Sequence, residues 1–181
     1  WDYPATTQMV LLDIPFQGEL RKLLVQVPKH GFVYVLDRVT GKLLSAEKFT
    51  KVTWASGYDL ATGRPIENPE VDYSKTGKAE LVYPGPLGGH NWNPVSWNPG
   101  TGLLYFSELQ MPSVFKADNA VGFKENGRRY NMALDMAGMM DDPAFLAELR
   151  NPRGSLIAWD VANARIAWQA AQAPPATGGT P

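Results

Sequence analysis

The chain has 181 residues, of which 44% are hydrophobic and 19% are charged, so it can bury a core and does not have a disordered composition. Its formal net charge of −1 argues against a general nucleic-acid-binding protein, which carries a basic excess. The absence of cysteine excludes disulfides, thiolate metal sites and cysteine nucleophiles from these residues. The apolar runs are too short to span a bilayer.

The first 50 residues have the pattern of short strands joined by turns. The expected strands are 8–13, 21–28, 31–37 and 42–46. Asp37 and Gly41 lie in the turn before the last of them. An aspartate accepts hydrogen bonds from turn amides and a glycine tolerates positive φ, so the pattern predicts a hairpin here.

The turn signature recurs along the chain with a nearly constant period. Asp37, Asp59 and Asn98 each have Thr-Gly three and four residues later, and Asp160 heads a diverged copy. With Asp59 set aside as a local extra turn, the spacings are 61 and 62 residues. An internal repeat of this length fits a four-stranded propeller blade with long loops. The sequence therefore predicts an all-β fold, a partial β-propeller of about three four-stranded blades. The blade repeats are expected around 8–50, 51–117 and 152–181.

Helical character is confined to an expected insertion at about 118–151. Within it Asp142 precedes Pro143, and apolar residues follow at helical spacing, which predicts a short helix with Asp142 as its N-cap. The nearby acidic residues Asp135 and Asp141 lack the spacing of a calcium-binding loop. We interpret this acidic group as the solvated start of the helix.

Several segments resemble a known enzyme family. Residues 158–168 resemble the tryptophan docking motif of quinoprotein dehydrogenases. Further segments are Trp1-Asp2-Tyr3, the 27–38 segment with Pro28-Lys29-His30-Gly31, Trp54 to Tyr58, and Gly88 to Pro94 with His90-Asn91-Trp92. In their order and spacing these segments resemble the alcohol dehydrogenases that depend on pyrroloquinoline quinone (PQQ). The resemblance extends over essentially the whole chain and is closest to the soluble quinoprotein or quinohaemoprotein alcohol dehydrogenases.

The resemblance implies an eight-bladed propeller with PQQ and Ca²⁺ near its axis, of which this chain is the C-terminal part. It also assigns roles to four residues. Asp2 matches the catalytic aspartate, which removes the hydroxyl proton and contacts Ca²⁺. Lys29 matches the cation at the PQQ carbonyls, and Asn91 and Trp92 match residues that contact the quinone from the side.

Four other residues are interpreted as structural. His30 and His90 are assigned to no metal, because two histidines without a third ligand make a poor metal site. Trp54 and Tyr58 are expected to pack between strands.

The resemblance implies a PQQ- and calcium-dependent dehydrogenase that oxidises primary alcohols or aldehydes in the periplasm. Its electron acceptor would be a cytochrome c or a quinone, and a separate haem c domain is compatible with the family. The chain is expected to be a fragment, inactive alone, which associates with the remaining blades or with itself because open sheets invite pairing. The alternatives are a non-enzymatic propeller scaffold of the outer-membrane assembly type and a sugar-directed quinoprotein dehydrogenase.

Overall fold

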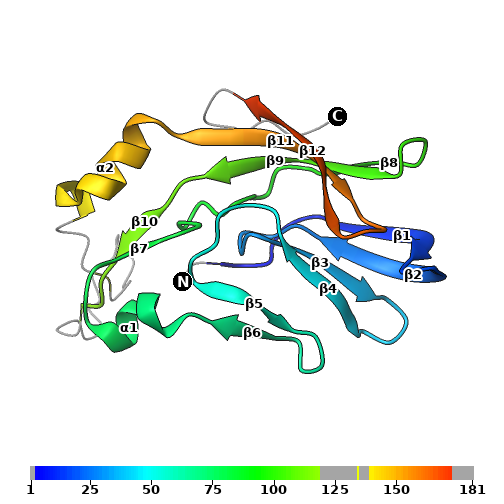
Figure 1. Ribbon diagram of the computed structural model, residues 1–181, viewed down its shortest axis with the longest axis horizontal. Helices are drawn as coiled ribbons and strands as arrows, with labels where there is room; N and C mark the ends of the chain where they lie inside the picture. Colours follow the sequence, from blue (N-terminus) through cyan, green and yellow to red (C-terminus); the bar gives the residue numbers. More distant parts are fainter. Residues whose placement is uncertain (1–2, 119–133, 135–138, 173–181) are drawn as a thin grey trace, which may run out of the picture.

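The computed structural model describes residues 3–118, 134 and 139–172, and these are mainly antiparallel strands (Figure 1). The described strands form two four-stranded sheets and two two-stranded sheets. The only described helices are short, and none of them is long and apolar enough to cross a membrane. The expected all-β class with four-stranded antiparallel units is confirmed.

The first sheet is a meander of strands that follow one another in the sequence. Its strands are β1 (Met9–Phe16), β2 (Glu19–Gln26), β3 (Phe32–Asp37) and β4 (Leu43–Lys48). At the predicted hairpin, a carboxylate oxygen of Asp37 accepts the backbone N–H groups of Val39 and Thr40 at 2.9 and 3.0 Å. Gly41 has a φ of 76°, as the turn requires. The hairpin prediction is confirmed.

The second sheet combines strands from two distant segments. Its strands are β8 (Ser96–Asn98), β9 (Leu103–Gln110), β11 (Arg153–Asp160) and β12 (Arg165–Gln172), in the spatial order β12-β11-β9-β8. Strand pairing therefore crosses the limits of the expected repeats 51–117 and 152–181. The physical reason is that the repeat spacing locates turns, whereas a sheet joins the strands that share a buried face.

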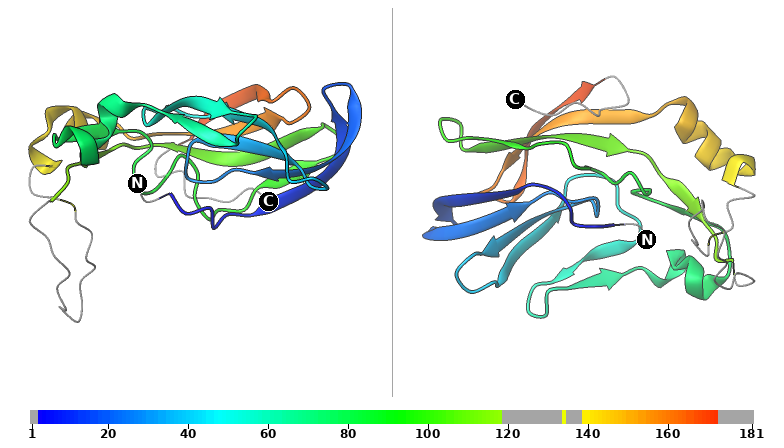
Figure 2. Two further views of the ribbon diagram at one scale, coloured as in Figure 1. Left: turned by 90° about the horizontal axis from the view of Figure 1, so that it is seen from below. Right: turned by 180° about the vertical axis from the view of Figure 1, so that it is seen from behind.

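The remaining elements lie around these sheets. The two small sheets pair β5 (Ala55–Asp59) with β6 (Arg64–Glu67), and β7 (Glu80–Val82) with β10 (Ser113–Phe115). The helices are the 3₁₀ turns Pro69–Val71 and Met139–Asp141, α1 (Tyr73–Thr76) and α2 (Pro143–Arg150). Figure 2 shows α1 and α2 at the same end of the flattened molecule.

Helix α2 begins where the sequence predicts. A carboxylate oxygen of Asp142 accepts the backbone N–H of Phe145 at 2.8 Å, and Pro143 is the first helical residue. Asp135 and most of the expected insertion at 118–151 lie outside the described residues.

The main core lies between the two large sheets. Leu23, Val25 and Val35 of the first sheet share one buried cluster with Phe106 and Trp159 of the second. Trp159 is the largest side chain in that cluster and is 1% exposed. Burial of a large apolar side chain contributes about 1.5–3 kcal/mol, so this cluster fixes the two sheets against each other.

Candidate functional site

Two of the four predicted site residues, Asn91 and Trp92, lie in one loop, and the backbone of that loop contacts the third, Lys29. Lys29 follows β2, and Asn91 and Trp92 lie in the irregular stretch that leads to β8. The backbone N–H of Gly89 donates to the carbonyl oxygen of Lys29 at 3.1 Å. The fourth residue, Asp2, lies outside the described residues. We call residues 87–93 the site loop.

Two glycines allow the site loop to approach Lys29 closely. A Cβ atom on Gly88 would lie 2.5 Å from Cγ and 2.7 Å from Cα of Lys29, and Gly88 also has a φ of +80°. A Cβ atom on Gly89 would lie 2.5 Å from Cγ2 of Thr50. Side chains at either position would displace the loop, so the Gly-Gly pair is what brings Lys29 and the loop together.

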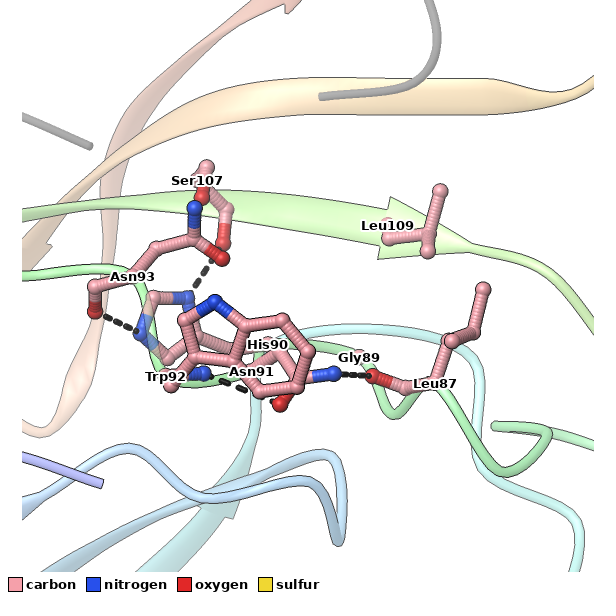
Figure 3. Close-up of a pocket in the computed structure, with 8 residues that line it drawn as sticks. All are labelled: Leu87, Gly89, His90, Asn91, Trp92, Asn93, Ser107 and Leu109. Atoms are coloured by element: carbon pink, nitrogen blue, oxygen red, sulfur yellow. Dashed lines mark hydrogen bonds between the residues drawn. The ribbon is translucent and has the colours of Figure 1, made fainter. Parts of the chain in front are cut away.

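The site loop is also joined to strand β9. The carbonyl oxygen of Gly89 accepts the backbone N–H of Leu109 at 2.8 Å. The imidazole of His90 is 2% exposed, with Nδ1 2.8 Å from the carbonyl oxygen of Ser107 and Nε2 3.1 Å from that of Asn93 (Figure 3). A neutral imidazole carries one N–H, so it donates to one of these carbonyls at a time.

Burial lowers the pKa of His90 below its ordinary value of 6.5, and the two facing carbonyl oxygens oppose that shift. The folded protein therefore favours the neutral imidazole over the cation. The ring also makes an edge contact with Phe106, with 5.7 Å between the ring centroids. His90 thus packs in the core while its nitrogens face the backbone.

Asn91 and Trp92 form the outer part of the site loop. The amide nitrogen of Asn91 donates to the carbonyl oxygen of Leu87 at 2.9 Å, and its amide oxygen accepts the Trp92 N–H at 3.0 Å. A carboxamide has two N–H groups and two oxygen lone pairs, so each end keeps bonding capacity for a ligand. The Trp92 side chain is 76% exposed and offers a flat aromatic surface.

A small cavity lies beside these residues. It has a volume of about 120 Å³, and its lining includes Leu87, Trp92 and Leu109, with His90 and Ser107 among its other walls (Figure 3). The cavity is mainly apolar because leucine and indole carbons form much of its surface. An apolar hollow with a few directed polar groups is typical of small-molecule sites.

Trp54 and Tyr58 lie in a second buried cluster with Phe32, as expected for residues that pack between strands. The indole N–H of Trp54 donates to the carbonyl oxygen of His30 at 3.0 Å. Burial lowers the pKa of His30, and its Nδ1 has no hydrogen-bond partner. Within the described ranges, no three acidic or histidine side chains group to hold a metal ion.

The chemistry of the converging residues suits a planar, electron-poor ligand with carbonyl or carboxylate oxygens. An ammonium group attracts such oxygens, an indole supplies a flat wall, and a carboxamide adds directional hydrogen bonds. These features fit a quinone cofactor. The described residues do not by themselves form a metal site, so any metal would need ligands from other parts of the protein.

Known proteins with similar sequences are named as alcohol dehydrogenases. A family model described as the beta-propeller domain of PQQ glucose/ethanol/alcohol dehydrogenases matches residues 1–53. The chain is 44% identical over 169 residues to the quinohemoprotein alcohol dehydrogenase ADH IIB of Pseudomonas putida. This match covers 93% of this chain and 23% of that protein. It is 38% identical over 187 residues to the 1-butanol dehydrogenase (cytochrome c) of Thauera butanivorans, over 99% and 26% of the two chains.

Solved structures give the same result. Quinohemoprotein alcohol dehydrogenase ADHIIG from Pseudomonas putida superimposes with a TM-score of 0.86 at 37% identity, over 99% of this chain and 27% of that one. A europium-containing methanol dehydrogenase gives 0.76 at 26% identity, over 95% and 29%. The expected partial propeller and the resemblance are confirmed. The chain spans about a quarter of the length of these relatives.

Two features of the site were missed in the sequence. The role of His90 in tying the loop to β9 was not predicted, nor was the approach of the loop to Lys29. The Gly88-Gly89 pair directly before His90 is the signal that could have indicated a close backbone contact.

Proposed function

We propose that this chain, which is homologous over nearly its whole length to PQQ-dependent alcohol dehydrogenases, is a propeller segment of an enzyme that oxidises primary alcohols or aldehydes. The observation that carries the proposal is the contact between Lys29 and the loop that bears Asn91 and Trp92. A scaffold protein has no need to bring a lysine, a carboxamide and an exposed indole together.

PQQ, when bound, supplies a carbonyl carbon that accepts the hydride of the alcohol. Lys29 would hold the quinone through its ammonium group, which would stabilise negative charge on a quinone oxygen. The Trp92 indole forms a wall that orients the ring system, and the remaining bonding capacity of the Asn91 amide fixes it from the side.

The proton of the alcohol requires a base, and we assign that role to Asp2. A carboxylate serves only if it is ionised at the working pH and within hydrogen-bond reach of the hydroxyl. The name of one structural relative includes a metal, europium. We propose Ca²⁺ as the metal here, with Asp2 as one of its ligands.

We propose that the remaining blades complete the site and that the 181-residue chain is inactive alone. Relatives named for haem and for cytochrome c support a cytochrome c or quinone as electron acceptor, with haem c in a separate domain as one arrangement. We place the enzyme in the periplasm.

The test is the substitution Asp2→Asn in the complete enzyme. Turnover of a primary alcohol should fall to background while PQQ stays bound, because the amide cannot take the proton but leaves Lys29, Asn91 and Trp92 unchanged. Asp13→Asn is the matched control, since Asp13 lies on strand β1 in an ion pair with Arg38. Full activity of Asp2→Asn would remove Asp2 from the mechanism.

A further inference from the structure

We infer that His90 is a positioning residue that fixes the two quinone-contacting residues of the site loop through a hydrogen bond from its buried ring to the backbone beside them, at Ser107 or at Asn93. This inference rests on the proposed function and adds to it the device that holds Asn91 and Trp92 in place. His90 itself is buried behind them and needs no contact with substrate or quinone.

The site loop requires such a device because it has no regular structure of its own. Residues 87–93 contain no strand or helix, so no ladder of backbone hydrogen bonds defines their conformation. Trp92 is 76% exposed, and few packing contacts restrain its side chain. Its position depends on how firmly the backbone at 91 and 92 is fixed.

The contacts of His90 bracket these two residues. Nδ1 faces the carbonyl oxygen of Ser107 on strand β9, so a proton on Nδ1 ties residue 90 to the second sheet. Nε2 faces the carbonyl oxygen of Asn93, so a proton on Nε2 ties the far side of the loop to the ring. Asn91 and Trp92 therefore lie between two carbonyl groups that face one buried ring, whose N–H bonds to one of them at a time.

Burial makes this arrangement more than incidental packing. A buried polar ring is destabilising unless its N–H finds a partner, and the two backbone carbonyls are the acceptors that the structure provides. The cost of burying the imidazole is offset only in this loop conformation. The ring therefore selects the conformation that presents Asn91 and Trp92.

The test compares PQQ affinity with folding stability in the complete protein. The apoprotein is titrated with PQQ, and the Kd is read from calorimetry, while the Tm of the apoprotein is measured separately. His90→Phe keeps an aromatic ring against Phe106 but removes both polar contacts. We expect its Kd to rise about tenfold or more, since buried hydrogen bonds of this kind contribute that factor.

Two conservative variants keep the inference testable if His90→Phe does not fold. The amide nitrogen of His90→Asn takes the place of Nδ1 and can donate to Ser107, whereas His90→Gln reaches towards the partner of Nε2. Each keeps a donor towards one of the two carbonyls, and the neutral ring donates to one of them at a time. The variant that keeps the donor to the bonded carbonyl should give a Kd near that of the wild type, and the other a Kd near that of His90→Phe. Wild-type Kd values for both would overturn the inference.

The matched control is Asn68→Ala, which removes another side chain that holds a loop through backbone contacts. The Asn68 amide donates to the carbonyl oxygen of Thr53 at 3.3 Å and accepts the N–H of Glu70 at 3.1 Å. This variant should lower the Tm and leave the Kd for PQQ unchanged. An equal rise in Kd for Asn68→Ala and His90→Phe would reduce His90 to general stability and contradict the inference.

Asn91→Ala separates this inference from the proposed function. If Asn91→Ala weakens PQQ binding and His90→Phe does not, the positioning role is wrong and the proposed site stands. If neither variant changes the Kd, the proposed contact loop itself is wrong.

Discussion

The two four-stranded sheets have the same form but arise in different ways. The first takes its strands in order from residues 9–48, whereas the second joins residues 96–110 to residues 153–172. Turns such as that of Asp37 suffice to order the first sheet. The second depends on shared burial across a long connection. The site draws on both, because Lys29 lies in the connection between β2 and β3 of the first sheet and the site loop leads into the second.

The largest effect is expected where the two sheets meet. Trp159→Ala should lower the free energy of unfolding by about 3–5 kcal/mol, because it removes the largest side chain of the shared core and leaves a cavity. Trp159→Phe should cost far less, since it keeps an aromatic ring and the indole N–H has no hydrogen-bond partner to lose. Urea denaturation of the complete protein measures both. Equal losses for the two variants would show that the shared core does not hold the second sheet.

Acid should destabilise the protein through its two histidines, of which His90 is buried and His30 is half-buried. Burial lowers the folded-state pKa of His30 and of His90 below 6.5, so the unfolded chain binds more protons below that pH. Their contribution to stability is complete above pH 6.5 and falls as the pH drops towards the folded-state pKa values.

The two histidines lie near different sheets. His30 adjoins the first sheet, and His90, which is more deeply buried, leads into the second. His90→Asn should therefore reduce the drop in Tm between pH 7.5 and pH 5.5 more than His30→Asn does. The reverse order would place the greater acid sensitivity in the first sheet.

A smaller effect is expected in the connection that the second sheet spans. Asp142→Ala should cost about 1 kcal/mol, because it removes the N-cap of α2, while Asp142→Asn should cost only a few tenths. Hydrogen exchange at the Phe145 amide gives the local readout. If the Phe145 amide exchanges at the same rate in the wild type and in Asp142→Ala, the cap does not stabilise this connection.

The sequence predicted the parts of the fold that depend on neighbouring residues. The strands of the first sheet, the Asp37 turn and the start of α2 follow from local patterns and agree with the structure within a few residues. The pairing of β9 with β11 and of β7 with β10 could not be predicted, because those partners are far apart and β7 and β10 are three residues long.

The candidate site was predictable to the same degree. The segments around Lys29, Asn91 and Trp92 carried the resemblance, but only the structure shows that they touch. The use of the Asn91 amide within its own loop and the two carbonyls at His90 depend on a backbone path without regular structure. No periodic pattern in the sequence encodes such a path.

The central claim is that Lys29 and the site loop together bind PQQ, and a titration of the complete apoprotein tests it most directly. Lys29→Gln removes the charge and keeps a similar length, whereas Lys22→Gln makes the same change at an exposed position on strand β2. We expect Lys29→Gln to raise the Kd for PQQ by about tenfold to a hundredfold, as the loss of a charge-assisted contact does. Lys22→Gln should leave it unchanged. Equal Kd values for Lys29→Gln and the wild type would contradict the assignment of this site.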